Sequence, residues 1–318
     1  MRALVTGSAG FIGSTLGERL LEAGHEVLGI DALTSSYDPV VKRGNLEASF
    51  AHSAFTFVED DLTALDLARV LREVDVVFHM AALPGSRDSW GRDFAAYEQA
   101  NVLATQRLLE AGREQSIQRF VYSSSSSVYG SAARFPVSES DLPHPITPYG
   151  VTKLAGEHLC RLYAYNFGIP TLSLRYFSVY GPRQRPDMAI HRVIDAGLSG
   201  RQFSVLGDGE QRRDFTFVDD VVDANVRAID ADLEPGTVVN IGTGTSTSLN
   251  RVIEIVADVL GRGITCCGDD SVPGDPQRTE ADVTLAAELL GWKPRTSLDS
   301  GIRAQVEDQS RARNRTPL

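Results

Sequence analysis

Short apolar runs rich in β-branched and aromatic residues alternate with longer amphipathic stretches along the first half of the chain. Such runs are typical of buried strands, whereas apolar positions that recur roughly every three to four residues indicate helices. The predicted strands occupy 3–7, 26–30, 55–58, 75–78, 119–123 and 171–176, and the predicted helices lie near 11–23, 97–112 and 149–167. Strands joined by helical crossovers form a parallel sheet covered on both faces. The first half therefore predicts an α/β fold built on a doubly wound parallel sheet.

The pattern loosens after residue 176. Helices are predicted near 187–198, 219–230, 249–260 and 282–290, separated by short strands and many turn residues. No Pro-, Gly- or Ser-rich linker divides the chain into independent modules. We interpret 1–176 as the main domain and 177–318 mainly as a smaller substrate lobe, with a strand near 238–241 that can rejoin the main sheet.

A glycine-rich turn follows the first predicted strand and opens the first predicted helix. It reads Gly7-Ser8-Ala9-Gly10-Phe11-Ile12-Gly13. Glycines so placed let backbone N–H groups approach a pyrophosphate at the positive end of the helix. Asp31 closes the second strand about 20 residues later, where a carboxylate binds both hydroxyls of an adenosine ribose and repels a 2′-phosphate. The turn and Asp31 predict a Rossmann-type domain that binds NAD rather than NADP.

Later strand ends supply further residues to the same edge of the sheet. Asp61 is expected to reach the adenine, and the small Ala81 and Ala82 to let the backbone approach the cofactor. His79, in the same strand end as the alanines, is expected to be structural rather than catalytic. The predicted cofactor contacts are Gly7, Gly10, Phe11, Ile12, Gly13, Asp31, Asp61, Leu62, Ala81, Ala82, Asn101, Tyr149, Lys153 and Tyr176.

Tyr149 and Lys153 lie four residues apart at the start of a predicted helix, so both side chains project from one face. A tyrosine ordinarily ionises near pH 10, too high for a base at neutral pH. An adjacent ammonium and a positive nicotinamide ring favour the phenolate and bring its pKa toward the working range. Tyr149 is therefore the predicted base, with Lys153 as its partner.

These motifs together resemble the extended short-chain dehydrogenases/reductases of the nucleotide-sugar epimerase and dehydratase group, along nearly the whole chain. In that group a serine or threonine in the loop after the fifth strand contacts the sugar C4 oxygen. Matching Val128-Tyr129-Gly130 selects Ser125 within the run Ser123 to Ser127, with a neighbouring serine as the alternative. Ser123 and Ser124 are expected only to cap turn backbone.

The same loop separates reaction types within the group. Dehydratases place Asp-Glu directly before Val-Tyr-Gly and decarboxylases place Glu there, whereas this chain has Ser126-Ser127. Without a carboxylate to move a C5 proton, the expected chemistry stops at reversible oxidation at C4. Epimerisation follows if the keto sugar turns over before the hydride returns.

The resemblance also implies a site for a nucleotide sugar. Three arginines, Arg192, Arg213 and Arg278, match positions that contact the diphosphate, and guanidinium forks suit phosphate oxygens. Val272 stands where many relatives have arginine, so one expected phosphate contact lacks its side chain. The predicted substrate contacts are Ser86, Arg87, Ser125, Ser126, Tyr149, Ser178, Arg185, Arg192, Gln211, Arg213 and Arg278, and the predicted catalytic residues are Tyr149, Lys153 and Ser125.

The sequence identifies the sugar of the substrate less precisely than its nucleotide. Residues 180–188, Tyr-Gly-Pro-Arg-Gln-Arg-Pro-Asp-Met, resemble the signature of epimerases that act on UDP-glucuronate, but the run also occurs in relatives that act on neutral sugars. Ser86, Arg87, Ser178 and Arg185 are candidates to hold a sugar carboxylate. The leading hypothesis is a UDP-glucuronate 4-epimerase. The alternatives are a 4-epimerase for UDP-glucose or UDP-N-acetylglucosamine, and a non-catalytic NAD-sensing regulator.

Composition narrows the cellular setting. A net charge of −11 disfavours a nucleic-acid partner, whose phosphates need a basic face. No apolar run is long enough to cross a membrane, and we expect that the start of the chain does not act as a signal peptide. Cys160, Cys266 and Cys267 form neither a disulfide framework nor a metal motif, which favours the cytoplasm. The resemblance further implies a homodimer that pairs the helices near 97–112 and 149–167.

Overall fold

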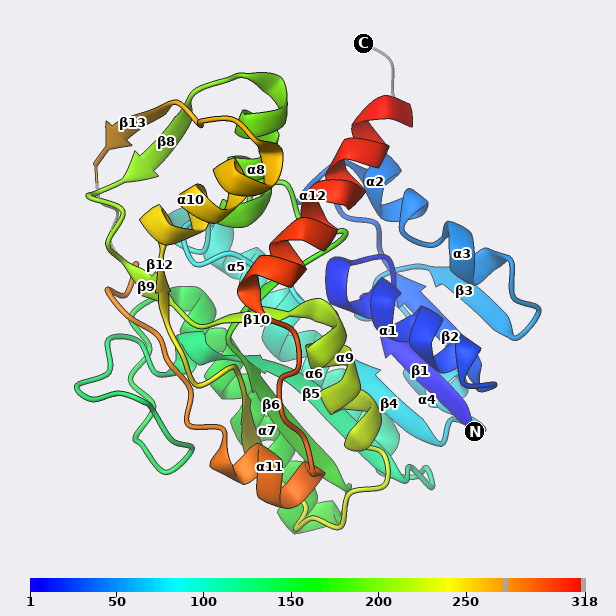
Figure 1. The fold of residues 1–318 in the computed structure, drawn as a ribbon. Helices are drawn as coiled ribbons and strands as arrows, with labels where there is room; N and C mark the ends of the chain where they lie inside the picture. Colours follow the sequence, from blue (N-terminus) through cyan, green and yellow to red (C-terminus); the bar gives the residue numbers. More distant parts are fainter. Residues whose placement is uncertain (271–273, 316–318) are drawn as a thin grey trace.

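The computed structural model describes residues 1–270 and 274–315 and is built around a seven-stranded parallel sheet (Figure 1). The strands follow the order β11-β6-β5-β4-β1-β2-β3. Their bounds are β1 (Arg2–Thr6), β2 (Glu26–Asp31), β3 (Phe55–Glu59), β4 (Val76–His79), β5 (Arg119–Ser125), β6 (Thr171–Tyr176) and β11 (Thr237–Ile241). The chain starts at β1, winds outward to β3, and returns to β4 on the other side of β1. The predicted doubly wound α/β fold is confirmed.

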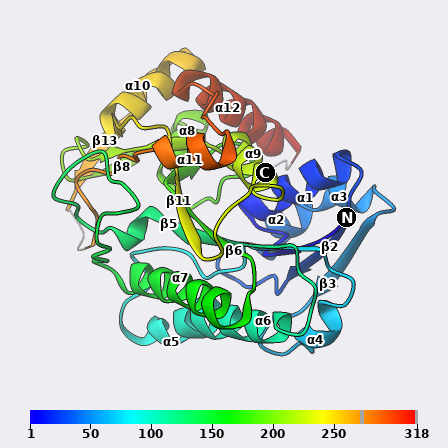
Figure 2. The same cartoon turned by 90° about the horizontal axis from the view of Figure 1, so that it is seen from below.

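Helices cover both faces of this sheet. Figure 2 shows α4, α5, α6 and α7 beneath it and α1, α9 and α11 on the opposite side. Alternate residues of β1 belong to different hydrophobic cores. Val5 packs on the face of the sheet that α1 covers, and Leu4 packs on the face that α6 covers. The bounds are α1 (Phe11–Glu22), α2 (Pro39–Gly44), α3 (Glu47–Phe50), α4 (Leu67–Val70), η1 (Gly91–Asp93), α5 (Phe94–Tyr97), η2 (Glu98–Leu103), α6 (Ala104–Gly112), η3 (Ser126–Val128) and α7 (Pro148–Phe167).

Some elements of the second half of the chain lie beside the sheet, and β11 belongs to it (Figure 1). Strand β11 pairs in parallel with β6, with Val239 opposite Leu174. The other strands of this half form pairs with β7 or with one another, and α8, α10 and α12 pack together. The bounds are β7 (Ser178–Tyr180), α8 (Ala189–Ser199), β8 (Phe203–Leu206), β9 (Arg212–Arg213), β10 (Phe215–Phe217), α9 (Val218–Arg227), β12 (Thr247–Ser248), α10 (Leu249–Leu260), β13 (Cys266–Asp269), α11 (Thr284–Leu290) and α12 (Leu298–Arg315).

The last helix, α12, is absent from the sequence-based prediction. Its buried face combines Ile302 and Val306 with the polar Gln305, and charged or polar side chains dominate the remainder. A face with so few apolar residues has little helical periodicity to detect. The helix near 97–112 also differs from its prediction, because it begins as the π-helix η2 and continues as α6.

Candidate active site

A cavity of about 490 Å³ lies at the carboxyl ends of the sheet strands. Strands β1 and β4 are neighbours there, and the chain leaves them toward opposite halves of the sheet, which is where doubly wound folds bind ligands. Most of the predicted site residues line it. These are Gly7, Gly10, Phe11, Ile12, Gly13, Asp31, Asp61, Leu62, Ala81, Ala82, Ser86, Arg87, Ser125, Ser126, Tyr149, Lys153, Tyr176, Ser178, Arg185 and Arg213.

In the glycine turn the backbone packs directly against the backbone of neighbouring segments. Gly7 has φ +67°, and a Cβ placed on it would lie 2.8 Å from the backbone nitrogen of Ala81. A Cβ on Gly13 would lie 2.2 Å from the Gly7 carbonyl oxygen. Helix α1 starts with Gly10 as its N-cap and has no side-chain cap, so its first N–H groups remain open toward the cavity. These contacts explain why glycine is needed at each of these positions.

Asp31 shapes the same turn from the end of β2. Its Oδ2 accepts a hydrogen bond from the Ala9 N–H at 3.0 Å, and its Oδ1 accepts one from the Leu33 N–H at 2.8 Å. A carboxylate has about four acceptor positions, so Asp31 retains capacity for two ligand hydroxyls. Asp61 is exposed, and its Oδ1 accepts from both the N–H and the hydroxyl of Thr63.

Sequence reasoning missed a second group beside Asp31, formed by Thr34, Ser36, Tyr37 and Lys42. All four line the cavity. The Lys42 ammonium donates to the Thr34 carbonyl oxygen at 2.7 Å and to the Ser36 hydroxyl at 3.2 Å, and burial lowers its pKa. No basic residue directly follows Asp31 in the sequence, and Lys42 comes close to Asp31 only through the folding of α2. Spacing along the chain carries no signal for that contact.

A buried hydrogen-bond chain lies behind the cavity wall. The two ring nitrogens of His79 bond to the hydroxyls of Thr6 and Thr105, at 2.8 and 2.9 Å. The Thr6 hydroxyl also accepts from the Ala81 N–H at 3.1 Å. His79 therefore supports the loop after β4 and does not face the cavity.

Asn101 belongs to the same supporting layer. Its side chain accepts from the Leu83 N–H at 2.7 Å and donates to the Leu83 carbonyl oxygen at 3.1 Å and to Thr152 at 3.0 Å. It is 1% exposed and is not among the cavity-lining residues. The prediction of a direct cofactor contact is thus not matched by its position, because its amide is occupied in holding the Leu83 backbone.

Helix α7 places Tyr149 and Lys153 on the cavity side. The helix begins after Thr147, whose hydroxyl accepts from the Gly150 N–H at 3.1 Å. Burial raises the pKa of Tyr149, while the Ser125 hydroxyl and the positive charge of Arg185 lower it. Burial lowers the pKa of Lys153 to about 8, and its ammonium lies 4.7 Å from the centre of the Tyr122 ring. Tyr149 thus has two neighbours that favour its phenolate.

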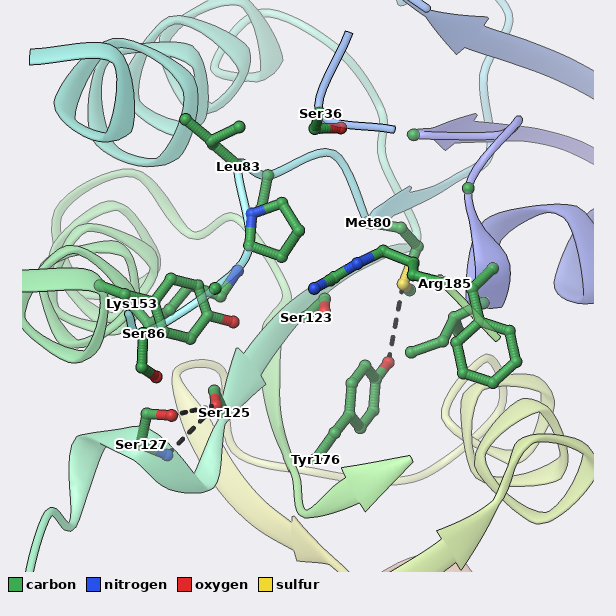
Figure 3. Close-up of a pocket in the computed structure, with 18 of the residues that line it drawn as sticks. Ser36, Met80, Leu83, Ser86, Ser123, Ser125, Ser127, Lys153, Tyr176 and Arg185 are labelled. Atoms are coloured by element: carbon green, nitrogen blue, oxygen red, sulfur yellow. Dashed lines mark hydrogen bonds between the residues drawn. The ribbon is translucent and has the colours of Figure 1, made fainter. Parts of the chain in front are cut away.

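The serine run divides into distinct roles (Figure 3). The Ser125 hydroxyl accepts from the Ser127 N–H and donates to the Ser127 hydroxyl, both at 3.1 Å, at the start of η3. The expectation for Ser124 is wrong: its buried hydroxyl donates to the Glu157 side chain instead of capping the turn. Ser125 is the residue that caps, because it directly precedes η3 as its N-cap.

Glu157 joins the catalytic elements through an ion pair that is buried on both sides. Its carboxylate accepts from Arg175 Nε at 2.8 Å and Nη2 at 2.7 Å. Arg175 also donates to the Tyr129 hydroxyl at 2.7 Å. Helix α7, the loop after β5 and strand β6 are thereby held in register, which fixes Ser125 relative to Tyr149.

The candidate residues for the sugar carboxylate also line the cavity. Arg185 reaches the cavity from the turn after β7 (Figure 3), and its side chain forms a two-point pair with Asp187 at 3.0 and 2.6 Å. Ser86 also lines the cavity, as does Ser178 at the start of β7.

Arg87 and Arg213 also line the cavity and share one acid. Arg213 pairs with Asp275, and Arg87 lies 3.8 Å from the other carboxylate oxygen. Two cationic side chains around a single carboxylate leave a net positive charge at this end of the cavity. Such a charge is suited to an anionic ligand.

Three predicted substrate residues lie off the cavity in this structure. Arg192 stacks on Phe203 at 5.6 Å, and Arg278 pairs with Glu280 at 2.8 Å. The Gln211 amide donates to the Leu206 carbonyl oxygen at 3.2 Å. Their direct contact with a substrate stays a prediction, and Val272 lies outside the described residues. Within 1–270 and 274–315, no helix is long and apolar enough to span a membrane, and no His, Cys, Asp or Glu cluster is placed to hold a metal ion.

Known proteins are similar to this chain in sequence and in fold. The sequence profile of the NAD dependent epimerase/dehydratase family matches residues 3–242. An uncharacterised UDP-glucose epimerase of Bacillus subtilis is 46% identical over 96% of this chain and 97% of its own, and a probable UDP-glucuronate 4-epimerase of Rhizobium meliloti is 36% identical over the full length of both. The UDP-glucuronic acid 4-epimerase from Bacillus cereus, solved with UDP-glucuronic acid and NAD, superposes with a TM-score of 0.95 at 43% identity, over 98% of this chain and 100% of its own.

Proposed function

The chain belongs to the NAD-dependent epimerase/dehydratase family, and we propose that it is a UDP-glucuronate 4-epimerase. The observation that carries this proposal is the meeting of Tyr149, Ser125 and Arg185 in one cavity with the glycine turn. The loop next to Tyr149 holds Ser126 and Ser127 where a dehydratase needs carboxylates. An intact base beside a cofactor turn also disfavours the alternative of a non-catalytic regulator.

The residues present fit NAD. The open N-terminus of α1 would face the pyrophosphate, and Asp31 would hold the adenosine ribose. Lys42 and Thr34 belong to the same end of the cavity, so we add them to the proposed adenosine contacts. Bound NAD supplies hydride transfer, taking a hydride from sugar C4 and returning it.

The protein's own groups move the proton. Tyr149 would take the proton of the C4 hydroxyl as the hydride leaves, and Ser125 would hold the same oxygen. Arg185 favours the phenolate by charge and Ser125 favours it by a hydrogen bond. The Lys153 ammonium, one helical turn further along α7, would add to the same effect. The product of this half-reaction is a 4-keto sugar that must turn over between the two hydride transfers. These roles are supported by the position of the residues, since all of them line the cavity: Tyr149, Ser125, Lys153 and Arg185.

The sugar carboxylate would lie against Arg185, with Ser86, Ser178 and Arg87 nearby. Charge-assisted hydrogen bonds to this carboxylate stabilise the anion and restrain its rotation. Such restraint matters because 4-keto-glucuronate is a β-keto acid that loses CO₂ when the C5–C6 bond aligns with the carbonyl π orbitals. At the other end, Arg213 would face the diphosphate.

One observation favours a second candidate, a 4-epimerase for UDP-glucose. Arg185 is paired with Asp187, and a neutralised arginine flanked by serine hydroxyls suits a C6 hydroxyl as well. Purified protein should be given UDP-glucuronate, UDP-glucose and UDP-N-acetylglucosamine, and the products followed by NMR. Conversion of UDP-glucuronate to UDP-galacturonate as the fastest reaction supports the proposal. Turnover of UDP-glucose alone refutes it.

We further propose that the protein works as a homodimer in the cytoplasm. Along α7, a stripe of outward positions at alternating spacings of four and three residues includes the exposed Val151, Leu162 and Tyr165. Tyr165 is 89% exposed, which is unusual for an aromatic residue on a helix with no partner. Light scattering should give twice the chain mass, and Tyr165→Asp with Leu162→Asp should halve it. The three unpaired cysteines support a reducing compartment.

A further inference from the structure

The turn formed by residues 181–188, between β7 and α8, carries Arg185 and Met188 into the cavity. Buried amides fasten this turn to helix α12. Gln305 accepts from the Gly181 N–H at 2.9 Å and donates to the Gln184 side chain at 2.7 Å. Gln184 in turn donates to the Val179 carbonyl oxygen at 3.0 Å. The turn is therefore anchored to the C-terminal helix at both Gly181 and Gln184.

Arg183 adds a third anchor and has an unusual backbone. Its φ is +66°, a conformation that side chains with a Cβ rarely adopt and that persists only where surrounding contacts hold it. Its N–H donates to Asp308 of α12 at 3.1 Å. Its Nη2 donates to both carboxylate oxygens of Glu18, at 2.8 and 2.9 Å, and the two side chains are only 27% and 19% exposed.

Glu18 belongs to α1, the helix whose first turn forms the cofactor end of the cavity. The Arg183–Glu18 pair thus joins the element that would hold NAD to the element that carries Arg185. Within the described structure, the side-chain hydrogen bonds of Arg185 go only to Asp187 of the same turn. The direction of the Arg185 guanidinium is therefore set by where the turn itself sits.

We propose that Arg183 is a positioning residue: its pair with Glu18 and its bond to Asp308 hold the 181–188 turn, and so Arg185, in register with the cofactor helix. This inference rests on the proposed function, in which Arg185 holds the sugar carboxylate. Arg183 itself is not among the cavity-lining residues. It would act on the reaction only through Arg185.

A comparison of two substitutions separates the effect of losing the Arg183 guanidinium from the effect of backbone strain. Arg183→Gly removes the guanidinium and accepts a φ of +66° without strain, whereas Arg183→Ala removes it and keeps the strain. Arg183→Lys keeps a positive charge that can reach Glu18. Arg201→Gly is the matched control, because Arg201 is an exposed arginine of the same lobe that pairs with Asp195 and does not line the cavity.

Arg183→Gly should retain bound NAD and slow epimerisation of UDP-glucuronate roughly 10- to 100-fold, the penalty of a small misplacement at a reacting centre. It should also release a larger fraction of UDP-4-keto-pentose, because a displaced Arg185 no longer restrains the carboxylate. Arg183→Lys should restore part of both properties. Hydrogen–deuterium exchange of peptides covering 181–188 should accelerate in Arg183→Gly and not in Arg201→Gly.

The exchange measurement separates this inference from the proposed function. Faster exchange with an increased pentose fraction supports the positioning role. Unchanged exchange at 181–188 in Arg183→Gly overturns it, whatever the substrate. A wild-type protein that ignores UDP-glucuronate refutes the proposed function, and the exchange result then still decides whether Arg183 holds the turn.

Discussion

His79 should make the stability of this protein depend on pH through a mechanism that its hydrogen bonds define. The Thr105 hydroxyl donates to the Asn101 carbonyl oxygen at 2.7 Å, so it can only accept from His79 Nε2–H. The Thr6 hydroxyl accepts from the Ala81 N–H and is free to donate to His79 Nδ1. The ring is therefore held neutral, with its proton on Nε2.

Protonation of Nδ1 would place two donors face to face in a site that is 1% exposed. Burial, with a smaller contribution from the charge of Lys153, lowers the pKa of His79 to about 3, against about 6.5 in the unfolded chain. The unfolded state binds the proton first as the pH falls, so the contribution to stability is complete above pH 6.5 and declines toward pH 3. Between pH 7 and pH 5 the free energy of unfolding should fall by about 2 kcal/mol from this residue alone, because a loss of about 1.4 kcal/mol per pH unit applies only over the roughly 1.5 units below the unfolded pKa.

Urea unfolding at pH 5, 6, 7 and 8 measures this effect against a variant with no titrating ring. His79→Asn is the matched choice, because its amide oxygen can accept from Thr6 at the position of Nδ1. The variant should be less stable than wild type at pH 7, and the difference should shrink by about 2 kcal/mol at pH 5. A pH dependence that is the same in both proteins would refute the reasoning, since His79 would then bind its proton equally in both states.

Other predictions concern the reaction. Tyr149→Phe should keep the fold and bound NAD and lose turnover by at least about 100-fold, the typical effect of removing a general base; near-normal turnover would exclude Tyr149 as the base. The protein should purify with NAD partly bound and turn over without added oxidant, and absorbance at 340 nm should show no accumulating NADH; steady release of NADH would instead indicate a dehydrogenase. Arg185→Ala should slow epimerisation of UDP-glucuronate and raise the released fraction of UDP-4-keto-pentose, measured by NMR, while neutral sugars respond less; normal epimerisation with no extra pentose would exclude Arg185 as a carboxylate ligand.

Local sequence rules predicted the parts of the fold whose causes are local. Helices α7 and α10 have clear starts at Thr147 and Ser248, whose hydroxyls cap the first turn, and both end at a glycine with positive φ. Helix α12 was missed because its buried side contains Gln305, which is stable there only through its bonds to Gly181 and Gln184. Those partners lie more than 100 residues away in the chain, where no periodicity can reveal them.

The site residues likewise fall into those that local sequence order identifies and those that depend on packing between distant segments. Gly7, Gly13 and Asp31 could be identified because a strand, a turn and a helix follow one another directly. Lys42 could not, because its place in the cavity depends on the packing of α2. Asn101 was assigned to the cofactor, yet its amide is used on Leu83, a contact decided by the loop after β4.

The turn at 180–188 shows why its signature does not distinguish a charged sugar from a neutral one. Asp187 neutralises Arg185 when no anionic ligand competes, so one turn can serve a C6 hydroxyl with the pair closed and a carboxylate with the pair open. The Asp187 side chain is 53% exposed and gains water on release, whereas the Arg185 side chain is only 19% exposed and needs an acceptor within the cavity. A carboxylate bound within the cavity, screened from water, receives the stronger charge-assisted contact. In the proposed reaction a sugar carboxylate would therefore compete with Asp187 for Arg185, so the presence of Arg185 alone does not set the substrate preference.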